Sequence, residues 1–294
     1  KGLPRSHLYR ILRKGEVRVN KGRVKPSRRL QAGDVVRVPP LRLAASAPPA
    51  AIGEGLRELL SDAVLYEDEG LLVLNKPSGL AVHGGSGTSL GVIEALRQIR
   101  PDERRLELVH RIDKDTSGCL MVAKSRPVLK ALQHALRERL VQKTYVALVM
   151  GRWPPGLSEV NAPLLRYTLA SGERRVKVSH DGKPSRTFFS VLDYFDGASL
   201  VQAKPLTGRT HQIRVHMAHI NHALVGDPVY AGRPKIPKAA SEALINSLRG
   251  FSRQALHACR LSLIHPSSGE TVSWDVPLAK DMVSLLALLL VEDV

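Results

Sequence analysis

Apolar residues recur at helical spacing in three stretches of the chain: residues 6–14, 127–140 and 282–291. In the first, Leu8, Ile11 and Leu12 fall on one side when successive residues are turned by about 100° around a helix axis. Ser6 is suited to cap the N-terminus of this helix, and Gly15 is suited to end it. The third stretch is shorter than the roughly 20 apolar residues that span a bilayer. It predicts a buried C-terminal helix.

Alternating or continuous apolar runs predict strands between these helices: EVRVN, DVVRVPP, LLVLNKP, KTYVALVMG, TFFSVLDYF and SLVQAKPL. The strands and isolated helices follow no regular βα repeat, and this irregular order favours an α+β fold. Residues 44–61 are rich in Ala, Pro and Gly, as many linkers are. The pattern therefore predicts a small domain over residues 1–43, a linker over 44–61 and a large domain over 62–294.

Positive charge is concentrated in the first of these domains. The chain has 44 Lys and Arg against 27 Asp and Glu, a net charge of +17, and residues 1–43 account for +11 of it. On the predicted helix, Arg10, Arg13 and Lys14 lie opposite the apolar side, and Arg18 follows on the next strand. Such a face is either a solvated surface or a contact for phosphates. Because almost no exposed position there is negative, it favours a polyanionic partner such as RNA.

Several classes of chemistry lack their motifs in this sequence. Cys119 and Cys259 are too few for a disulfide framework or a thiolate metal site, and they fit a reducing compartment. The start, KGLPRSHLYR, has no apolar leader, and the chain has no nucleotide-binding glycine loop, HExxH or CxxC. Four histidines lack a carboxylate or thiolate at the spacing of a metal site: His211, His216, His219 and His222. We therefore expect a cytoplasmic protein with no metal, no cofactor and no membrane span.

Two segments concentrate the side chains that could react. LVHRIDKDTSGCLMVAK (108–124) places His110, Arg111 and Asp113 between two apolar strands, where a loop at a sheet edge can hold catalytic groups. A plain structural turn fits its composition equally well. In PLTGRTHQIRVHMAHINHALVGDPVY (205–230), Arg209 and Arg214 bracket a predicted short strand. An Arg beside a buried carboxylate favours its ionised form, so one of the two could face the acidic loop.

Together these segments resemble the RluA-type family of pseudouridine synthases. HRIDKDTSG is similar to the family's HRLDxxTSG signature, with Ile112 in place of Leu, and GRTHQIRVH, NKPSGLAVH and KTYVALVMG are similar to three further motifs. The resemblance covers nearly the whole chain from about residue 62, and residues 3–39 resemble the S4 RNA-binding module without its first helix. It implies a mixed, largely antiparallel central sheet flanked by helices, the pseudouridine synthase fold, beside a small α/β S4-like domain.

The resemblance also implies roles for individual residues. Asp113 matches the essential Asp that detaches uracil from C1′ before the base reattaches through C5, by attack at C1′ or by removal of a ribose proton. Tyr145 matches the Tyr that stacks on the uracil, and Arg214 matches the Arg that pairs with the catalytic Asp. Arg111 matches the Arg that enters the RNA stack when the base flips out. The expected contacts with RNA are Arg111, Arg209, His110, Arg10, Arg13, Lys14 and Arg18.

Several functions remain open at this point. YRILRKGEVRVN resembles the RluC branch, which favours RluC-like sites in 23S (large-subunit) ribosomal RNA. RVHMAHINHALVGDPVYAGRPK looks more like the RluD branch, which modifies a stem-loop at the subunit interface. A non-catalytic ribosome-assembly factor would be expected to have lost Asp113, Tyr145 or Arg214, and all three are present. A glycosidase would need a second, acidic carboxyl group, for which only Asp115 is near. We expect a monomer that acts on 23S rRNA or on the assembling large subunit.

Overall fold

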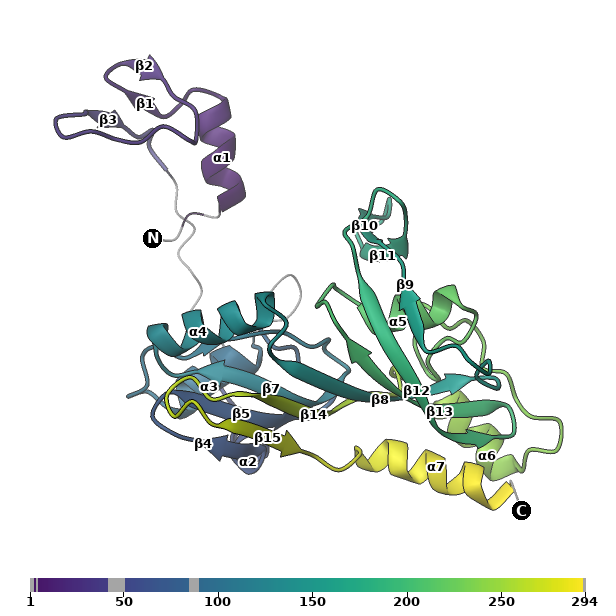
Figure 1. Ribbon diagram of the computed structural model, residues 1–294. Helices are drawn as coiled ribbons and strands as arrows, with labels where there is room; N and C mark the ends of the chain where they lie inside the picture. The colour runs from purple at the N-terminus through teal and green to yellow at the C-terminus, as the bar shows by residue number, and fades with distance from the viewer. Residues whose placement is uncertain (1–2, 4, 42–50, 85–89, 293–294) are drawn as a thin grey trace. The chain divides into compact units, whose positions relative to one another are not determined.

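Two units make up the chain in the computed structural model, Lys1–Pro49 and Ala50–Val294. The structure describes residues 3, 5–41, 51–84 and 90–292. The first unit holds the predicted helix and a three-stranded antiparallel sheet in the order β2–β1–β3 (Figure 1). Its elements are α1 (Arg5–Arg13), β1 (Arg18–Val19), β2 (Gly22–Arg23) and β3 (Val36–Arg37). Ile11 of α1 is buried with Val17 and Val19, whereas the basic side of α1 is exposed.

A ten-stranded sheet forms the frame of the second unit. Its order is β4–β5–β7–β14–β8–β13–β12–β9, with β6 beside β7 and β15 beside β14. The strands are β4 (Val64–Glu67), β5 (Leu71–Lys76), β6 (Glu107–Leu108), β7 (Ser117–Ala123), β8 (Gln142–Met150), β9 (Glu159–Asn161), β12 (Arg186–Phe195), β13 (Ala198–Pro205), β14 (Leu256–Ile264) and β15 (Thr271–Asp275). Among the described strands only β7 and β14 pair in parallel. The predicted α+β fold with a mixed, largely antiparallel sheet is therefore confirmed.

Helices cover both faces of this sheet. They are α2 (Glu54–Asp62), α3 (Val92–Ile99), α4 (Arg126–Arg137), α5 (Gln212–His219), α6 (Glu242–Gly250) and α7 (Lys280–Glu292). On β5, Leu72 and Leu74 pack into one core with α2 and α3, while Leu71 and Val73 pack into another with α4 (Figure 1). Alternate residues of a strand point to opposite faces, so a strand covered on both sides is apolar throughout. This is why LLVLNKP reads as a continuous apolar run.

Helices α6 and α7 pack against residues of β8, β12 and β13. Leu148 of β8 lies in one buried cluster with Leu244 of α6 and with Leu285 and Leu289 of α7. The predicted C-terminal helix is thus confirmed, and it is buried along one side. Within the described residues no helix has both the length and the apolar character to cross a membrane. A separate antiparallel hairpin, β10 (Leu164–Thr168) and β11 (Arg174–Val178), stands beside α5 (Figure 1).

Two segments differ from the sequence predictions. Of the proposed linker 44–61, residues 44–50 lie outside the described residues, and the last part forms α2, whose Leu60 is wholly buried. Residues 210–214 were predicted as a short strand, but Gln212–His219 form α5. Six consecutive residues of α5, 212–217, are buried. A helix enclosed on all sides shows no amphipathic spacing, and a short buried helix cannot be told from a strand by periodicity.

Candidate active site

The loop that carries Asp113 joins β6 to β7, and Lys76 anchors it from the end of β5. The Lys76 side chain is wholly buried, and its ammonium donates to the carbonyl oxygen of Lys114 at 2.8 Å. It also donates to the carbonyl oxygens of Pro77 at 2.7 Å and Leu80 at 2.8 Å. Burial lowers the pKa of Lys76 to about 7, although the nearby carboxylates oppose this shift. One lysine therefore ties the turn that follows β5 to the Asp113 loop.

A second anchor comes from the residues that precede β14. Arg253 donates to the carbonyl oxygen of Asp115 at 3.2 Å, and Gln254 donates to the hydroxyl of Thr116 at 3.1 Å. The other side of the Arg253 guanidinium binds both carboxylate oxygens of Asp281 in α7, at 2.5 and 2.7 Å. The Asp115 backbone thus has a structural role, and its side chain does not line the pocket described below.

Arg214 lies between two carboxylates. From α5 its Nη1 donates to Oδ2 of Asp113 at 3.1 Å, so the structure brings these two predicted residues together. Its Nε and Nη2 bind the two carboxylate oxygens of Asp227 at 2.7 and 2.9 Å. Burial opposes the charge of Arg214, but the two carboxylates outweigh it and raise its pKa above the usual range. The bidentate pair with Asp227 fixes the plane of the guanidinium that Asp113 meets.

Asp227 is itself held by the backbone that follows it. Its Oδ1 accepts hydrogen bonds from the amides of Val229 at 2.9 Å and Tyr230 at 3.1 Å. Burial alone would raise the pKa of this carboxyl group, but the Arg214 guanidinium and the two amides lower it. Asp227 is therefore a fixed negative charge behind Arg214, and its side chain is fully enclosed.

His211 contacts the other oxygen of the Asp113 carboxylate. Its Nε2 lies 3.9 Å from Oδ1 of Asp113, and its Nδ1 lies 2.8 Å from the hydroxyl oxygen of Tyr230. His211 is the N-cap of α5 and has a φ of 52°, a left-handed conformation that is uncommon for a residue other than glycine. Burial lowers the pKa of His211, and Asp113 opposes the shift. The ring is thus clamped between the carboxylate and the tyrosine.

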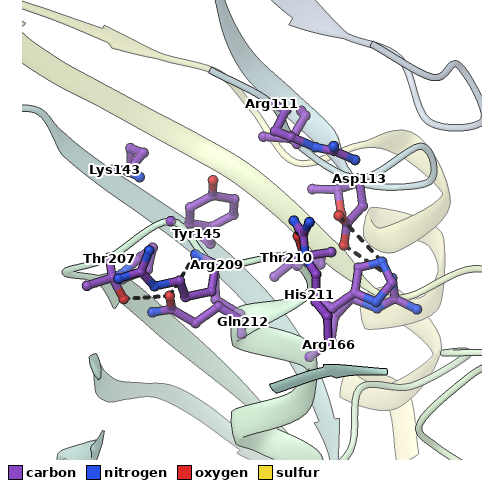
Figure 2. A pocket seen from close by; sticks show the side chains of 17 residues that line it. Arg111, Asp113, Lys143, Tyr145, Arg166, Thr207, Arg209, Thr210, His211 and Gln212 are labelled. Atoms are coloured by element: carbon purple, nitrogen blue, oxygen red, sulfur yellow. Dashed lines mark hydrogen bonds and ion pairs between the residues drawn. The ribbon is translucent and has the colours of Figure 1, made fainter. Parts of the chain in front are cut away.

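Strand β8 supplies one wall of a pocket of about 110 Å³ beside Asp113. Tyr145 and Lys143, two residues apart and therefore on the same face of β8, both line it (Figure 2). Burial raises the pKa of the Tyr145 phenol, so the hydroxyl stays protonated at neutral pH. Asp113 and Tyr145 come from segments on either side of β14 and meet in this pocket.

Arginine side chains surround the pocket mouth. Arg111, on the Asp113 loop, and Arg209 both line it and are exposed (Figure 2). Arg209 donates through Nε to the carbonyl oxygen of Pro184 at 3.1 Å. Arg166, from the β10–β11 hairpin, donates to the hydroxyl of Thr210. The two predicted RNA contacts, Arg111 and Arg209, therefore lie where a polyanion entering the pocket would pass.

Other predicted RNA contacts lie outside the pocket. The Nε2 of His110 accepts a hydrogen bond from the Met121 amide at 3.1 Å, and burial lowers its pKa to about 3. A neutral ring that anchors the loop to β7 has a structural role. Arg18 donates to the carbonyl oxygens of Gly15 at 3.4 Å and Lys21 at 3.3 Å, and so supports a turn. The predicted contacts Arg10 and Arg13 of α1, and Lys14 directly after it, are exposed in the first unit.

Sequence reasoning missed Asp227, His211, Lys143 and Lys76. Asp227 lies in a Gly-Asp-Pro turn. An Asp in a turn commonly accepts hydrogen bonds from the backbone just after it, so the sequence alone does not suggest a distant partner. The sequence suggests capping and core hydrogen bonds for His211 rather than metal binding, but not contact with Asp113. Its spacing of three residues from Arg214 would place the two on neighbouring turns of a helix. Lys143 shares a strand face with Tyr145, and this spacing was a usable signal.

Histidines of α5 and the turn after it make hydrogen bonds within the fold. His216, wholly buried, lies 2.9 Å from the hydroxyl oxygen of Thr187 and 3.0 Å from that of Ser185. His222 lies 3.0 Å from the carbonyl oxygen of Met150. In the described part of the chain, no group of three or more His, Cys, Asp or Glu side chains is arranged to hold a metal ion.

Both units are similar to known protein families. A family model described as RNA pseudouridylate synthase matches residues 70–219, and the S4 domain model matches residues 1–36. Curated relatives called ribosomal large subunit pseudouridine synthase C include that of Pasteurella multocida, 52% identical over 98% of this chain and 87% of the relative. That of Escherichia coli K12 is 51% identical over 95% of this chain and 86% of the relative. That of Haemophilus influenzae is 49% identical over 97% of this chain and 87% of the relative.

Two solved human structures are similar in fold to most of this chain. Human RNA pseudouridylate synthase domain containing 4 is 26% identical, with a TM-score of 0.65, over 80% of this chain and 95% of that chain. Human RNA pseudouridylate synthase domain containing 1 is 28% identical, with a TM-score of 0.59, over 77% of this chain and 86% of that chain.

Proposed function

Because this chain belongs to the RNA pseudouridylate synthase family, we propose that it converts uridines of large-subunit (23S) ribosomal RNA to pseudouridine at the sites of the RluC branch. Several relatives, 49% to 52% identical over nearly the whole chain, are called ribosomal large subunit pseudouridine synthase C. Their similarity extends through the basic first unit as well as the second. This favours the RluC-like choice of sites over the RluD-like one.

The paired carboxylate of Asp113 at the wall of the pocket is the observation that carries this proposal. A carboxylate can attack C1′ of the target uridine or remove a ribose proton, and both routes require it to be ionised. Arg214 lies 3.1 Å from Asp113 and is itself held by Asp227, so a positive charge is already in place when substrate enters. Such preorganisation avoids reorienting the charge during the reaction.

Tyr145 and Arg111 receive complementary roles. The target base must leave the RNA stack before its glycosidic bond can be reached, at a cost of a few kcal/mol. Tyr145 presents a buried ring on the pocket wall, and base stacking on an aromatic ring contributes about 1–3 kcal/mol. Arg111 is exposed at the mouth, where it can enter the position that the base vacates. Stacking in the pocket then offsets the cost of extrusion.

Phosphate contacts are assigned to the exposed basic face of the first unit, Arg10, Arg13 and Lys14, and to Arg209 at the pocket mouth. Arg18 and His110 are left out of this assignment because both are engaged with backbone groups of the protein. A monomer is sufficient for this function, since all proposed catalytic groups come from one chain.

Replacing Asp113 tests the catalytic assignment. We expect Asp113→Asn to abolish pseudouridine formation in a transcript of the target rRNA region and to leave its dissociation constant within about twofold. The fold should survive because Arg214 keeps its bidentate partner Asp227. Asp115→Asn is the matched control, since that carboxylate lies on the same loop but does not line the pocket. Residual pseudouridine formation by Asp113→Asn would disprove the role of Asp113.

Choice of sites requires a separate measurement. Large-subunit rRNA from a strain that lacks the gene is treated with carbodiimide and mapped by primer extension, with and without the gene restored. We expect the RluC-type sites to be lost and regained together. Loss of the subunit-interface stem-loop modifications instead would assign the chain to RluD-like function.

A further inference from the structure

We propose that Lys143 is a further catalytic residue, whose ammonium stabilises the negative charge on the uracil base while it is detached from the ribose. This inference rests on the proposed function, because it concerns the same pocket and the same reaction. It assigns the leaving base its own charged partner, distinct from the Asp113 and Arg214 pair.

The placement of Lys143 is the first argument. It lies two residues before Tyr145 on β8, on the same face, and both residues line the pocket. Figure 2 shows Asp113 and Lys143 on opposite sides of the Tyr145 ring. A Cβ built on Gly208, which also lines the pocket, would lie 3.6 Å from Nζ of Lys143, so the ammonium end lies beside the loop that follows β13, the strand paired with β8. A base stacked on Tyr145 would have its sugar side toward Asp113 and an oxygen-bearing edge toward Lys143.

The lack of a partner is the second argument. Among the described residues the Lys143 side chain has neither a hydrogen bond nor an ion pair, although burial lowers its pKa. The other cations around the pocket differ from it. Arg214 has two carboxylates, Arg166 and Arg209 donate to protein oxygens, and Arg111 is exposed to solvent. A partly buried cation without a partner is unfavourable for folding, and such groups concentrate at functional sites.

The charge balance of the reaction identifies the detached uracil anion as the partner of Lys143. When the N1–C1′ bond breaks, its electron pair stays on the base, which becomes an anion with charge spread over N1 and the two carbonyl oxygens. The base then turns, and the C5–C1′ bond forms from an electron pair of the base. One proton leaves C5 and one is taken up at N1, so the isomerisation consumes no co-reactant. The negative charge exists only in the detached state, and an ammonium beside it lowers the barrier without tightening substrate binding.

A phosphate is the competing ligand, and the layout of the pocket disfavours it. The arginines that suit phosphates, Arg111 and Arg209, are exposed at the mouth, where the RNA backbone passes. Lys143 stands deeper, beside the ring on which the base is proposed to stack. The two ligands also predict different behaviour. A phosphate contact strengthens RNA binding and steepens its salt dependence, whereas a contact with the detached base changes neither.

The test compares Lys143→Met and Lys143→Arg with wild type in single-turnover reactions at saturating RNA. We expect Lys143→Met to slow pseudouridine formation about 100-fold, the size of the loss when one preorganised donor is removed, and Lys143→Arg to restore most of the rate. The RNA dissociation constant and its salt slope should not change. The melting temperature of Lys143→Met should equal or exceed that of wild type, because the variant loses only an unpaired charge. Lys183→Met is the matched control, since it removes one positive charge from a neighbouring depression that shares Gly208 and Arg209 with the pocket.

A second substrate separates leaving-group stabilisation from other causes. Fluorine at C5 stabilises negative charge on the detached base, so breakage of the glycosidic bond in 5-fluorouridine depends less on Lys143. We expect the defect of Lys143→Met, measured as consumption of 5-fluorouridine in the same RNA, to shrink at least tenfold. An equal defect on both substrates, a rate within threefold of wild type, or a change confined to affinity and salt slope would each overturn the inference. If wild type itself forms no pseudouridine, the proposed function fails instead.

Discussion

At the scale of single residues, Arg214 binds two carboxylates at once. Asp227 takes two of its donors in a fully enclosed pair, and Asp113 takes a third at the pocket wall. A Lys at this position could not reproduce the planar, forked geometry that serves both carboxylates at once. Asp113 depends on a neighbour that is already held in place, and Asp227 is therefore a positioning residue.

Lys76 gives the site a measurable pH signature. Its pKa is about 7 in the folded protein, whereas the ordinary value for a lysine, as in the unfolded chain, is 10.5. At a pH between these two values, Lys76 is therefore protonated in the unfolded chain but largely neutral in the folded protein. Stability therefore rises with pH across this window, by up to about 1.4 kcal/mol per pH unit at its steepest, and the gain is absent below pH 7. We expect urea unfolding at pH 7, 8 and 9 to show wild type gaining stability relative to Lys76→Met. A difference that stays constant with pH would mean that Lys76 keeps its ordinary pKa when buried.

At the same scale, the sequence singled out the proposed reactive residues but not the residues that hold them in place. Asp113, Tyr145 and Arg214 stand in motifs whose spacing is recognisable, and the structure places all three around one pocket or its wall. Asp227, Lys76 and His211 act through contacts between segments far apart in the chain, such as the Lys76 bond to Lys114. Such contacts leave no periodic trace in the sequence. Only the fold brings the partners together.

At the scale of elements, β14 determines how the pocket is assembled. It lies between β7, which follows the Asp113 loop, and β8, which carries Tyr145. Its parallel pairing with β7 is so close that a Cβ on Gly118 would lie 2.3 Å from the carbonyl oxygen of Ala258. Gly118 also has a φ of +107°, a region that side chains rarely adopt. The glycine of the TSG motif is therefore required by strand packing.

We expect Gly118→Ala to cost about 3 kcal/mol or more of folding free energy, since backbone strain and overpacking each contribute about 1–3 kcal/mol. Gly269→Ala is the control, because Gly269 also has a positive φ, +76°, but its added Cβ would meet nothing within 4 Å. Denaturant unfolding of the two variants checks the difference. Equal losses would show that the close approach of β7 and β14 relaxes without penalty.

Element prediction failed for one buried helix and for one helix with few apolar positions. Strand β8 was recognisable from its continuous apolar run, and helix α4 from apolar residues at helical spacing on one face. In α5, by contrast, consecutive buried residues such as Ile213, Arg214 and Val215 conceal the helical period. Helix α2 was read as linker because its composition outweighed the few apolar positions, among them Leu60, that it buries.

At the scale of the whole molecule, charge is divided unequally along the chain. Residues 1–43 hold +11 of the net +17, and the remainder is nearly balanced for its size. The proposed affinity for RNA and the proposed catalysis are thus assigned mainly to different segments. Long-range attraction to phosphates needs only charge density, whereas the pocket needs fixed geometry.

Removing the basic residues at α1 should weaken RNA binding without slowing catalysis. We expect the combined substitution Arg10→Gln, Arg13→Gln and Lys14→Gln to reduce the slope of log K against log salt by about 2, at roughly 0.7 per lost phosphate contact. The single-turnover rate at saturating RNA should stay near that of wild type. Replacing Arg126, Lys130 and Arg137 of α4, three exposed cations of the other unit, by Gln is the control. An equal change in slope for both trios would show that the α1 face has no special part in binding.

The central position of β14 also has a consequence for synthesis on the ribosome. The strand between β7 and β8 is encoded after both, together with Arg253 and Gln254, which brace the Asp113 loop. A nascent chain that has emerged only as far as α6 already exposes its basic first unit, but Asp113 and Tyr145 still lack the strand that sets their separation. If the first unit binds phosphates as proposed, such a chain would capture RNA before it could modify it. Premature termination near residue 250 would therefore yield an inactive competitor for the same RNA.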